Sequence, residues 1–168
     1  MIRVLIVGLG NMGLSHALAH HKHADAEIVG LVNRSGRVTH PDLAGYPVFT
    51  DYAQALDTTK PDLVVISTYS DTHADYAVAA MRAGAHVFVE KPLATTVADA
   101  KRVVACAGET GRKLAVGYIL RHHPSWVRLI EEARGLGGPY VFRMNLNQQS
   151  SGAEWETHKA LMLIQILF

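Results

Sequence analysis

The chain has 168 residues, of which 49% are apolar, and a formal net charge of +1, which suits one globular domain with a sizeable core and part of another. Because the charge is nearly balanced and no run of Lys and Arg alternates with aromatic residues, a nucleic-acid-binding protein is not expected. A single cysteine excludes a disulfide framework, and no apolar run approaches the roughly 18 residues that a membrane-spanning helix needs.

The first residues, MIRVLIVG, begin a strand pattern directly, without the basic leader and small-residue cleavage site of a secretory signal. Cys106 lies in a stretch rich in Ala and Val, where a lone cysteine is usually a buried apolar residue. We therefore expect a cytoplasmic protein that neither crosses a membrane nor carries a disulfide.

Residues 3–13, RVLIVGLGNMG, predict a strand, a tight turn and the start of a helix. Gly8, Gly10 and Gly13 have the GxGxxG spacing of a dinucleotide-binding turn, in which the glycines permit chain reversal, approach of a diphosphate to the backbone, and close helix packing. Glycines also cluster in ordinary turns, but the strand before and the helix after this one favour dinucleotide binding. The expected cofactor-binding residues of the turn are Gly8, Gly10, Asn11, Met12 and Gly13.

A helix is expected from Asn11 to Lys22, and it carries a cluster of histidines. His16 and His20 have the i, i+4 spacing of two metal ligands, but no acidic residue or cysteine lies nearby to complete a site, so no metal is expected. His16 lies one turn beyond the glycines and could approach a cofactor. The helix is expected to bury Leu14, Ala17, Leu18 and His21.

The second strand, expected at Glu27–Val32, leads into Asn33, Arg34 and Ser35. An NAD-binding unit usually places a carboxylate here, which accepts hydrogen bonds from the ribose hydroxyls. A neutral Asn33 followed by a guanidinium and a hydroxyl instead favours a 2′-phosphate, so NADP is preferred over NAD as the cofactor. A polar surface loop with solvated arginines is the simpler alternative.

Leu63–Ser67, LVVIS, is continuously apolar and predicts a central parallel strand. Ligands gather beside the carboxyl ends of such strands, so the residues that follow are expected in the cofactor crevice. Asp71 or Thr72 could instead cap a helix at Thr72–Ala83. A short strand near Val48 and a helix from an Asp51 cap to Leu56 come before this unit. The cofactor-binding candidates here are Thr68, Tyr69 and His73.

A strand at His86–Val89 ends at Glu90, Lys91 and Pro92. Hydride transfer at a carbinol carbon moves negative charge onto its oxygen, and a fixed ammonium at Lys91 would stabilise that charge and could pass a proton. Glu90 could pair with Lys91 and orient it, while Pro92 ends the strand and favours a cis bond more than other residues do. A solvated lysine at a strand end is the plainer alternative.

Further elements are expected at residues 97–107 (helix), 113–117 (strand), 126–133 (helix capped by Ser125 and ended by Gly135) and 139–147 (half-buried strand). The residues after the strand at 113–117 are candidates for substrate contact or for an interdomain role. They are Tyr118, Arg121 and His123.

The glycine turn, the segment from Thr68 to His73, AGAHVFVEKPLA and GYILRHHP together resemble the Gfo/Idh/MocA family of oxidoreductases. The resemblance implies an α/β Rossmann domain, a doubly wound parallel sheet with helices on both faces, at residues 1–120. Residues 121–168 then correspond to the incomplete start of an α+β C-terminal domain. The implied activity is NAD(P)-dependent oxidation or reduction of a small polyhydroxy substrate, a sugar or cyclitol, with Lys91 reaching both the cofactor ribose and the reacting oxygen.

The chain departs from this family in its C-terminal part. Family members are about twice as long and carry an Asp-x-Gly-x-His element beyond a region to which Trp155 corresponds, and this element is absent here. The apolar run Leu161–Phe168 needs cover, so the part after Asn147 is expected to be either disordered or paired with another chain, as in a homo-oligomer. Three functions remain open: a cofactor-binding half, a reductase that uses Tyr118, His122 or His123, and a non-catalytic regulatory or partner-binding module. A methyltransferase is disfavoured.

Overall fold

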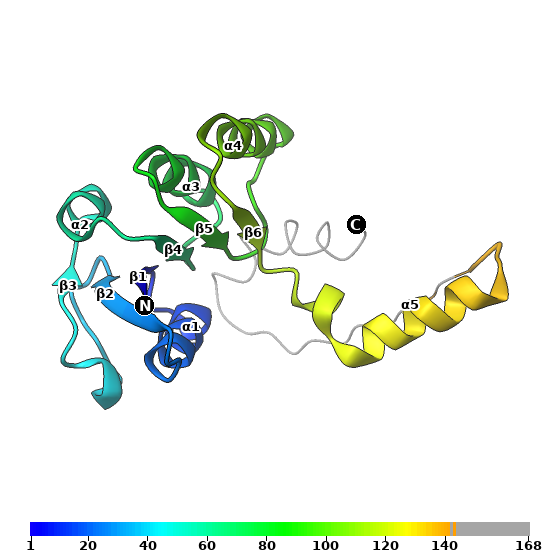
Figure 1. Cartoon of the computed structure of the whole chain (residues 1–168), viewed down its shortest axis with the longest axis horizontal. Coiled ribbons are helices and arrows are strands. Elements are labelled where there is room, and N and C mark those ends of the chain that lie inside the picture. Colours follow the sequence, from blue (N-terminus) through cyan, green and yellow to red (C-terminus); the bar gives the residue numbers. More distant parts are fainter. Residues whose placement is uncertain (142, 144–168) are drawn as a thin grey trace, which may run out of the picture. The chain divides into compact units, whose positions relative to one another are not determined.

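The computed structural model describes residues 1–141 and 143, and the chain divides into two compact units, Met1–Gly117 and Tyr118–Phe168. The first unit is built on a six-stranded parallel sheet with the strand order β3-β2-β1-β4-β5-β6, which confirms the predicted doubly wound α/β fold (Figure 1). Its strands are β1 (Ile2–Val7), β2 (Ala26–Val32), β3 (Val48–Phe49), β4 (Leu63–Ile66), β5 (His86–Val89) and β6 (Leu114–Val116).

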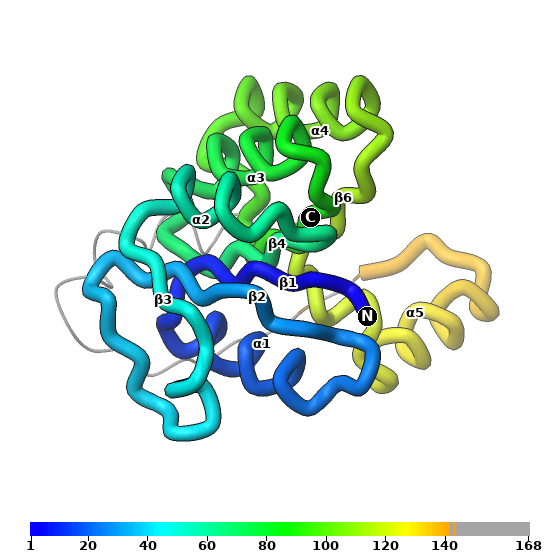
Figure 2. Tube along the Cα trace, turned by 60° about the vertical axis from the view of Figure 1, so that its left-hand side comes forward, coloured from blue at the N-terminus to red at the C-terminus, as the bar shows by residue number. Residues whose placement is uncertain are grey.

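Helices cover both faces of the sheet: α1 lies on one face, and α2, α3 and α4 lie on the other, as both views show (Figures 1 and 2). The strand order reverses between β1 and β4, where neighbouring connections run to opposite faces and leave a crevice at the carboxyl ends. The helices of the first unit are α1 (Asn11–His21), α2 (Tyr52–Thr59), α3 (His73–Arg82) and α4 (Val97–Thr110), with a short 3₁₀ helix at Pro41–Leu43.

The centre of the sheet is β1, whose last four residues are at most 1% exposed. Its side chains alternate between two hydrophobic clusters, because successive residues of a strand point to opposite faces. Leu5 and Val7 pack with α2, α3 and α4, whereas Val4 and Ile6 pack with Ala17 of α1. Burial on both faces explains why Val4–Val7 of β1 and the whole of β4 are apolar without interruption.

Helix starts were predicted better than helix ends. Asp51 caps α2 as predicted, accepting a hydrogen bond from the Gln54 amide at 2.7 Å, but the helix continues to Thr59. The predicted end of α4 at Ala107 is wrong, because Gly108 is accommodated inside the helix and Gly111, with φ of 65°, closes it. A glycine weakens a helix without breaking it, so its position alone does not mark an end.

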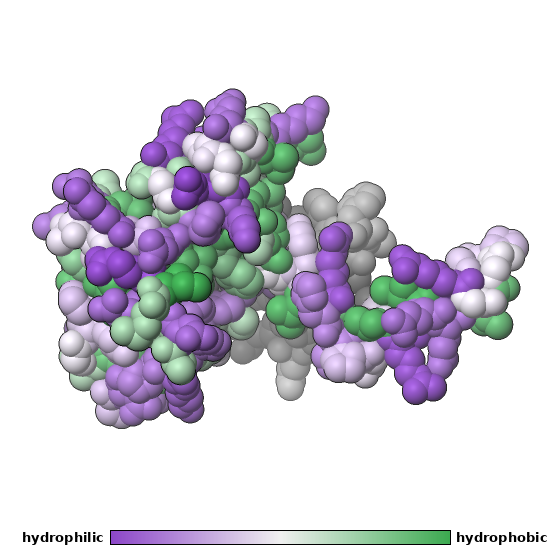
Figure 3. All heavy atoms as spheres, viewed as in Figure 1, coloured by the Kyte–Doolittle hydropathy of each residue, from purple (hydrophilic) through white to green (hydrophobic). Residues whose placement is uncertain are grey.

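In the second unit, α5 spans Pro124–Leu136, after a 3₁₀ helix at Ile119–His122. The predicted Ser125 cap is wrong: Pro124 occupies the first turn, which suits a residue with fixed φ and no N–H, and His123 is the N-cap. The helix also passes through Gly135 and ends at Gly137. None of its residues is buried, and Figure 3 shows apolar atoms at its surface among hydrophilic ones.

Of the strand predicted at residues 139–147, the described residues 139–141 and 143 are not in a strand. Val141 is fully exposed, and an alternating pattern forms a strand only where a neighbouring strand pairs with it, so the pattern alone did not suffice. Residue 142, residues 144–147, Trp155 and the apolar run Leu161–Phe168 lie outside the described residues.

His21, predicted on the buried side of α1, is exposed, and its imidazole hydrogen-bonds the Tyr46 hydroxyl at 2.9 Å. Cys106 is buried as predicted, with 2% of its surface exposed. No helix within the described part of the chain has the length and apolar character needed to cross a membrane.

Two glycines in helices provide a matched test of close packing. A Cβ at Gly13 would lie 1.9 Å from the Gly8 carbonyl oxygen, whereas a Cβ at Gly108 would meet no atom within 4 Å. We expect Gly13→Ala to destabilise the fold by about 1–3 kcal/mol through overpacking against backbone. Gly108→Ala should stabilise it by about 0.5–1 kcal/mol, because alanine loses less backbone entropy. Urea unfolding followed by circular dichroism measures both, and equal stabilities of the two variants would contradict the packing described here.

Candidate functional site: the crevice at the carboxyl ends of the strands

A groove of about 520 Å³ lies at the carboxyl ends of β1, β2 and β4, where the strand order reverses. Seven residues predicted to bind a cofactor line it together, although they come from three separate parts of the sequence: Gly8, Gly10, Asn33, Arg34, Ser35, Thr68 and Tyr69. Thr72, which follows the same strand as Thr68 and Tyr69 and was expected in the crevice or as a helix cap, lines the groove as well. The groove wall also contains polar residues that sequence reasoning did not select: Thr50, Tyr52, Ser67 and Tyr76.

The glycine turn brings α1 against the end of β1. Gly8 has φ of +87°, and a Cβ there would lie 2.4 Å from the Ser67 carbonyl oxygen. A Cβ at Gly13 would overlap the Gly8 carbonyl, so two of the three glycines are required by the protein's own backbone. A Cβ at Gly10 would meet no atom within 4 Å, so Gly10 leaves space that the protein does not fill.

The start of α1 carries the features of an anion-binding site. No side chain among the described residues caps the helix, and its first turn holds no acidic residue. Its first amides therefore keep free hydrogen-bonding capacity, and the helix dipole places partial positive charge there. Beside the turn, the Ser67 hydroxyl is buried without a hydrogen-bond partner in the described structure. A diphosphate fits such a place, because it supplies acceptors and negative charge.

The loop after β2 is fixed by Asn33. Its side-chain amide donates to the Ser35 hydroxyl at 3.1 Å and to the Arg37 carbonyl at 2.7 Å. The Ser35 hydroxyl also accepts a hydrogen bond from the Arg37 backbone amide at 3.3 Å. Arg34 lines the groove and makes no ion pair within residues 1–141 and 143. Among the described residues that line the groove, none carries a carboxylate, the usual partner of ribose hydroxyls.

Two stacked tyrosines form one wall of the groove. The rings of Tyr52 and Tyr76 lie 4.3 Å apart, and the Tyr52 hydroxyl donates to the Tyr76 carbonyl at 2.8 Å. Burial, and then the nearby Tyr76, raise the pKa of Tyr52 far above its usual value, so Tyr52 stays neutral. Its role is therefore to build the wall rather than to exchange protons.

The strand end at Glu90 is built around a buried carboxylate. Glu90 is 6% exposed, and its Oε1 accepts a hydrogen bond from the His16 Nε2 of α1 at 2.9 Å. Its Oε2 accepts from the Lys91 backbone amide at 3.2 Å. The hydrogen bond from His16 is the main cause that lowers the pKa of Glu90, against the opposing effect of burial. Glu90 is thus ionised and fixed at neutral pH.

The predicted pairing of Glu90 with the Lys91 side chain is wrong. The carboxylate is occupied by His16 and by backbone, and no ion pair in the described chain involves the Lys91 ammonium. Lys91 is exposed, and its bond to Pro92 is cis. A buried carboxylate needs a hydrogen-bond partner, and Glu90 finds it on α1 rather than in the lysine next to it. Because α1 is far from Glu90 in the sequence, local patterns do not reveal this partner.

His73 lies behind the groove rather than in it. It is 1% exposed, and its Nδ1 and Nε2 lie 2.7 Å from the Pro92 carbonyl and 3.1 Å from the Thr68 carbonyl. A neutral imidazole donates to one of these carbonyls and an imidazolium to both. His73 therefore links the ends of β4 and β5, and it is not among the described residues that line the groove. Asn11, Met12 and Gly13 adjoin the groove without being part of its lining.

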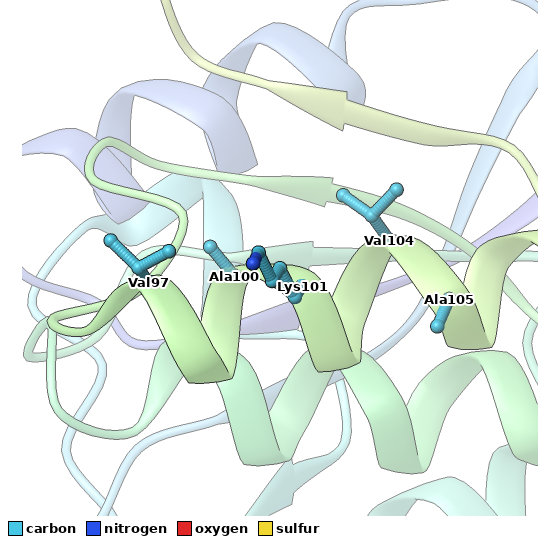
Figure 4. Close-up of a pocket in the computed structure, with 5 residues that line it drawn as sticks. All are labelled: Val97, Ala100, Lys101, Val104 and Ala105. Atoms are coloured by element: carbon cyan, nitrogen blue, oxygen red, sulfur yellow. The ribbon is translucent and has the colours of Figure 1, made fainter.

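Tyr118, Arg121 and His123 belong to the second unit. Within it, the Arg121 guanidinium lies 5.6 Å from the centre of the Tyr118 ring, a cation–π distance. Within residues 1–141 and 143, no three potential metal ligands cluster. A second hollow, about 450 Å³, lies on α4 alone and is lined by small apolar side chains and one lysine, without convergent polar groups (Figure 4).

The chain is similar in sequence to two curated dehydrogenases. It is 34% identical over 167 residues to inositol 2-dehydrogenase from Agrobacterium fabrum, covering 95% of this chain and 50% of that protein. It is 35% identical to 4-carboxy-2-hydroxymuconate-6-semialdehyde dehydrogenase from Sphingobium sp., covering 94% and 54%. The chain thus spans about half the length of the curated relatives it matches.

Among solved structures, the WlbA dehydrogenase from Chromobacterium violaceum, in complex with NADH and UDP-GlcNAcA, matches with a TM-score of 0.70 and 27% identity. The match covers 80% of this chain and 40% of that one. The model of the oxidoreductase family Gfo/Idh/MocA, described as an NAD-binding Rossmann fold, matches residues 2–118. This match covers more than half of the chain and agrees with the parallel sheet seen here, and the chain therefore belongs to the Gfo/Idh/MocA oxidoreductase family.

Proposed function

We propose that residues 1–120 bind a nicotinamide dinucleotide and present it for hydride transfer to or from a carbinol carbon of a sugar or cyclitol. The observation that carries this proposal is the groove at the glycine turn. There, space that the protein does not fill at Gly10, an uncapped helix start and the unpartnered Ser67 hydroxyl meet in one place. Hydrogen-bonding groups without partners at the helix start and at Ser67 cost free energy unless a ligand pairs with them, and the open space at Gly10 gives a ligand room to approach. A diphosphate suits all three features.

Each part of the cofactor would be held by a different part of the groove. The amides that open α1 would hold the diphosphate, with Asn11 and Met12 contributing backbone in the first turn. The loop at Asn33, Arg34 and Ser35 would hold the adenosine ribose, and Thr68 and Tyr69 would line the path toward the nicotinamide. The bound cofactor supplies hydride chemistry, and the protein supplies its orientation.

Lys91 is the proposed catalytic residue. It follows the end of β5 and is exposed, and the carboxylate of Glu90 beside it is held by His16 and by the Lys91 backbone amide. Its ammonium is thus available to stabilise negative charge on the reacting oxygen and to pass a proton. Tyr118, Arg121 and His123 remain candidates for substrate contact. The polyhydroxy substrate is proposed from relatives such as inositol 2-dehydrogenase.

We further propose NADP as the preferred cofactor. The side chain that replaces the usual carboxylate, Asn33, is neutral, and its amide is engaged in holding the loop. Arg34 projects from the same loop into the groove lining without an internal ion pair in the described chain. A guanidinium binds a phosphate through paired charge-assisted hydrogen bonds, which a ribose hydroxyl does not match.

Cofactor binding by this chain is the first test. A methyl group at Gly10 would occupy open space, so Gly10→Ala should leave the melting temperature unchanged while weakening dinucleotide binding by about tenfold, through contact with the diphosphate. Isothermal titration with NADPH and NADH measures the affinity, and a thermal melt without ligand is the control. Unchanged affinity for both dinucleotides would rule out the diphosphate position.

The NADP preference is tested at Arg34. We expect the parent chain to bind NADPH more tightly than NADH. Because Arg34→Ala removes a charge-assisted hydrogen bond to the 2′-phosphate, it should weaken NADPH binding by about tenfold and change NADH binding little. Arg82→Ala, in the last turn of α3 and outside the groove lining, is the matched control. Equal affinities of the parent for NADPH and NADH, measured by isothermal titration, would contradict the preference.

A further inference from the structure

The turn at Glu90–Pro92 is fixed from both faces of the sheet. From one face, His16 of α1 donates to the Glu90 carboxylate at 2.9 Å. From the other, His73 of α3 contacts the Pro92 carbonyl at 2.7 Å. Lys91 lies between these two anchored residues. Its backbone amide donates to the Glu90 Oε2 at 3.2 Å, so the position of the carboxylate directly constrains the position of the Lys91 backbone.

The space around the Glu90 carboxylate is closed. A Cβ at Gly117 would lie 3.0 Å from Oε2 and 3.1 Å from Oε1, so the residue after β6 must be small to admit the carboxylate. The ring of Phe88 lies edge-on to the His16 imidazole, with centroids 4.9 Å apart. His16 is thus oriented by packing on β5, while the Glu90 end is confined by Gly117.

His16 is also part of the helix that starts at the glycine turn, 74 residues before Glu90 in the sequence. The hydrogen bond therefore joins the element that offers its amides to a diphosphate and the element that carries the lysine. A buried carboxylate held in this way is rarely a large source of stability, because the cost of its desolvation offsets most of the attraction to its partner. It does fix geometry, since both oxygens of the carboxylate have directional partners.

We propose that His16 is a positioning residue that acts through Glu90 to hold Lys91 at a fixed place relative to the glycine turn. The inference rests on the proposed function, because it assigns His16 a role in arranging that site. In this role His16 contacts no reacting atom and acts only through Glu90. Its effect should appear only where a ligand extends from the diphosphate position to Lys91.

The hydrogen bond itself can be tested without a ligand. The groups facing the Glu90 carboxylate are the His16 imidazole, the Lys91 backbone amide and, at longer range, the Lys91 ammonium. Because His16 lowers the pKa of Glu90 below its ordinary value of 4.5, Glu90 stabilises the fold above that value, and this stabilisation is lost as the pH falls through the lowered pKa.

In His16→Leu, the donor that lowers the pKa of Glu90 is lost while burial still raises it, so this contribution should shrink and the variant should lose less stability on acidification than the parent does. His16→Gln, which keeps an N–H donor, should behave more like the parent, and Glu90→Gln should lack this contribution. Melting temperatures between about pH 3 and pH 7 measure the size of this loss, in a window that spans the carboxyl titration. Parent and His16→Leu curves of the same shape would show that the hydrogen bond is absent in solution and would overturn the proposal.

The positioning role is tested with two ligands of different reach. NADH extends from the diphosphate position to the nicotinamide, whereas ADP contains only the adenosine diphosphate half. We expect His16→Leu to weaken NADH binding by about five- to tenfold, the effect of losing one well-placed interaction, and to change ADP binding less than about twofold. His16→Gln should recover most of the NADH affinity. His21→Leu, on the same helix but paired with Tyr46, is the matched control and should change neither.

Lys91→Met should weaken NADH binding to a similar extent. If His16 acts through Lys91, adding His16→Leu to Lys91→Met should cost little more, so the two changes are not additive. Additive losses, or equal losses of NADH and ADP affinity in His16→Leu, would overturn the positioning role and leave the proposed function intact. A parent chain that binds neither NADH nor ADP would overturn the proposed function, and the inference with it.

Discussion

The site depends on how closely α1 approaches the end of β1. A Cβ at Gly13 would lie 1.9 Å from the Gly8 carbonyl oxygen, so the helix can start where it does only because both positions lack side chains. This start lies where the strand order reverses, directly after Gly10, which lines a groove at the ends of β1, β2 and β4. The packing that completes the core on one face of the sheet therefore also creates a place for an anion.

A buried charge imposes the second requirement. Glu90 is 6% exposed at the end of β5, and an isolated carboxylate there would be strongly unfavourable. Its partner, His16, comes from the same helix whose start lines the glycine turn. Hydrophobic packing holds α1 against the sheet at Ala17, and this hydrogen bond adds a directional link on the side of β5. One helix thus relates the anion position to the strand that carries Lys91.

The sequence was sufficient for features that local chemistry determines. Continuous apolar runs located β1 and β4, the Asp51 cap located the start of α2, and glycine spacing located the turn. It was not sufficient where the outcome depends on distant residues. The partner of Glu90 lies 74 residues away, and no local pattern identifies it. His73, predicted at the cofactor, is instead buried between two carbonyls, because its place on α3 turns it behind the strand ends. Gly108 and Gly135 were misjudged as helix ends, because packing and neighbouring residues decide whether a glycine is tolerated.

Cofactor choice depends on a smaller part of the site than cofactor binding does. The glycine turn would recognise a diphosphate that NAD and NADP share, so it cannot discriminate between them. At Asn33, the amide nitrogen is engaged with Ser35 and Arg37, which leaves the side-chain oxygen as a neutral acceptor for a ribose hydroxyl. A neutral acceptor does not repel a 2′-phosphate as a carboxylate would, and it binds a hydroxyl less strongly. On the proposed preference for NADP, selectivity would therefore depend on whether Arg34 meets a phosphate, which is a property of one exposed loop and independent of the fold that presents it.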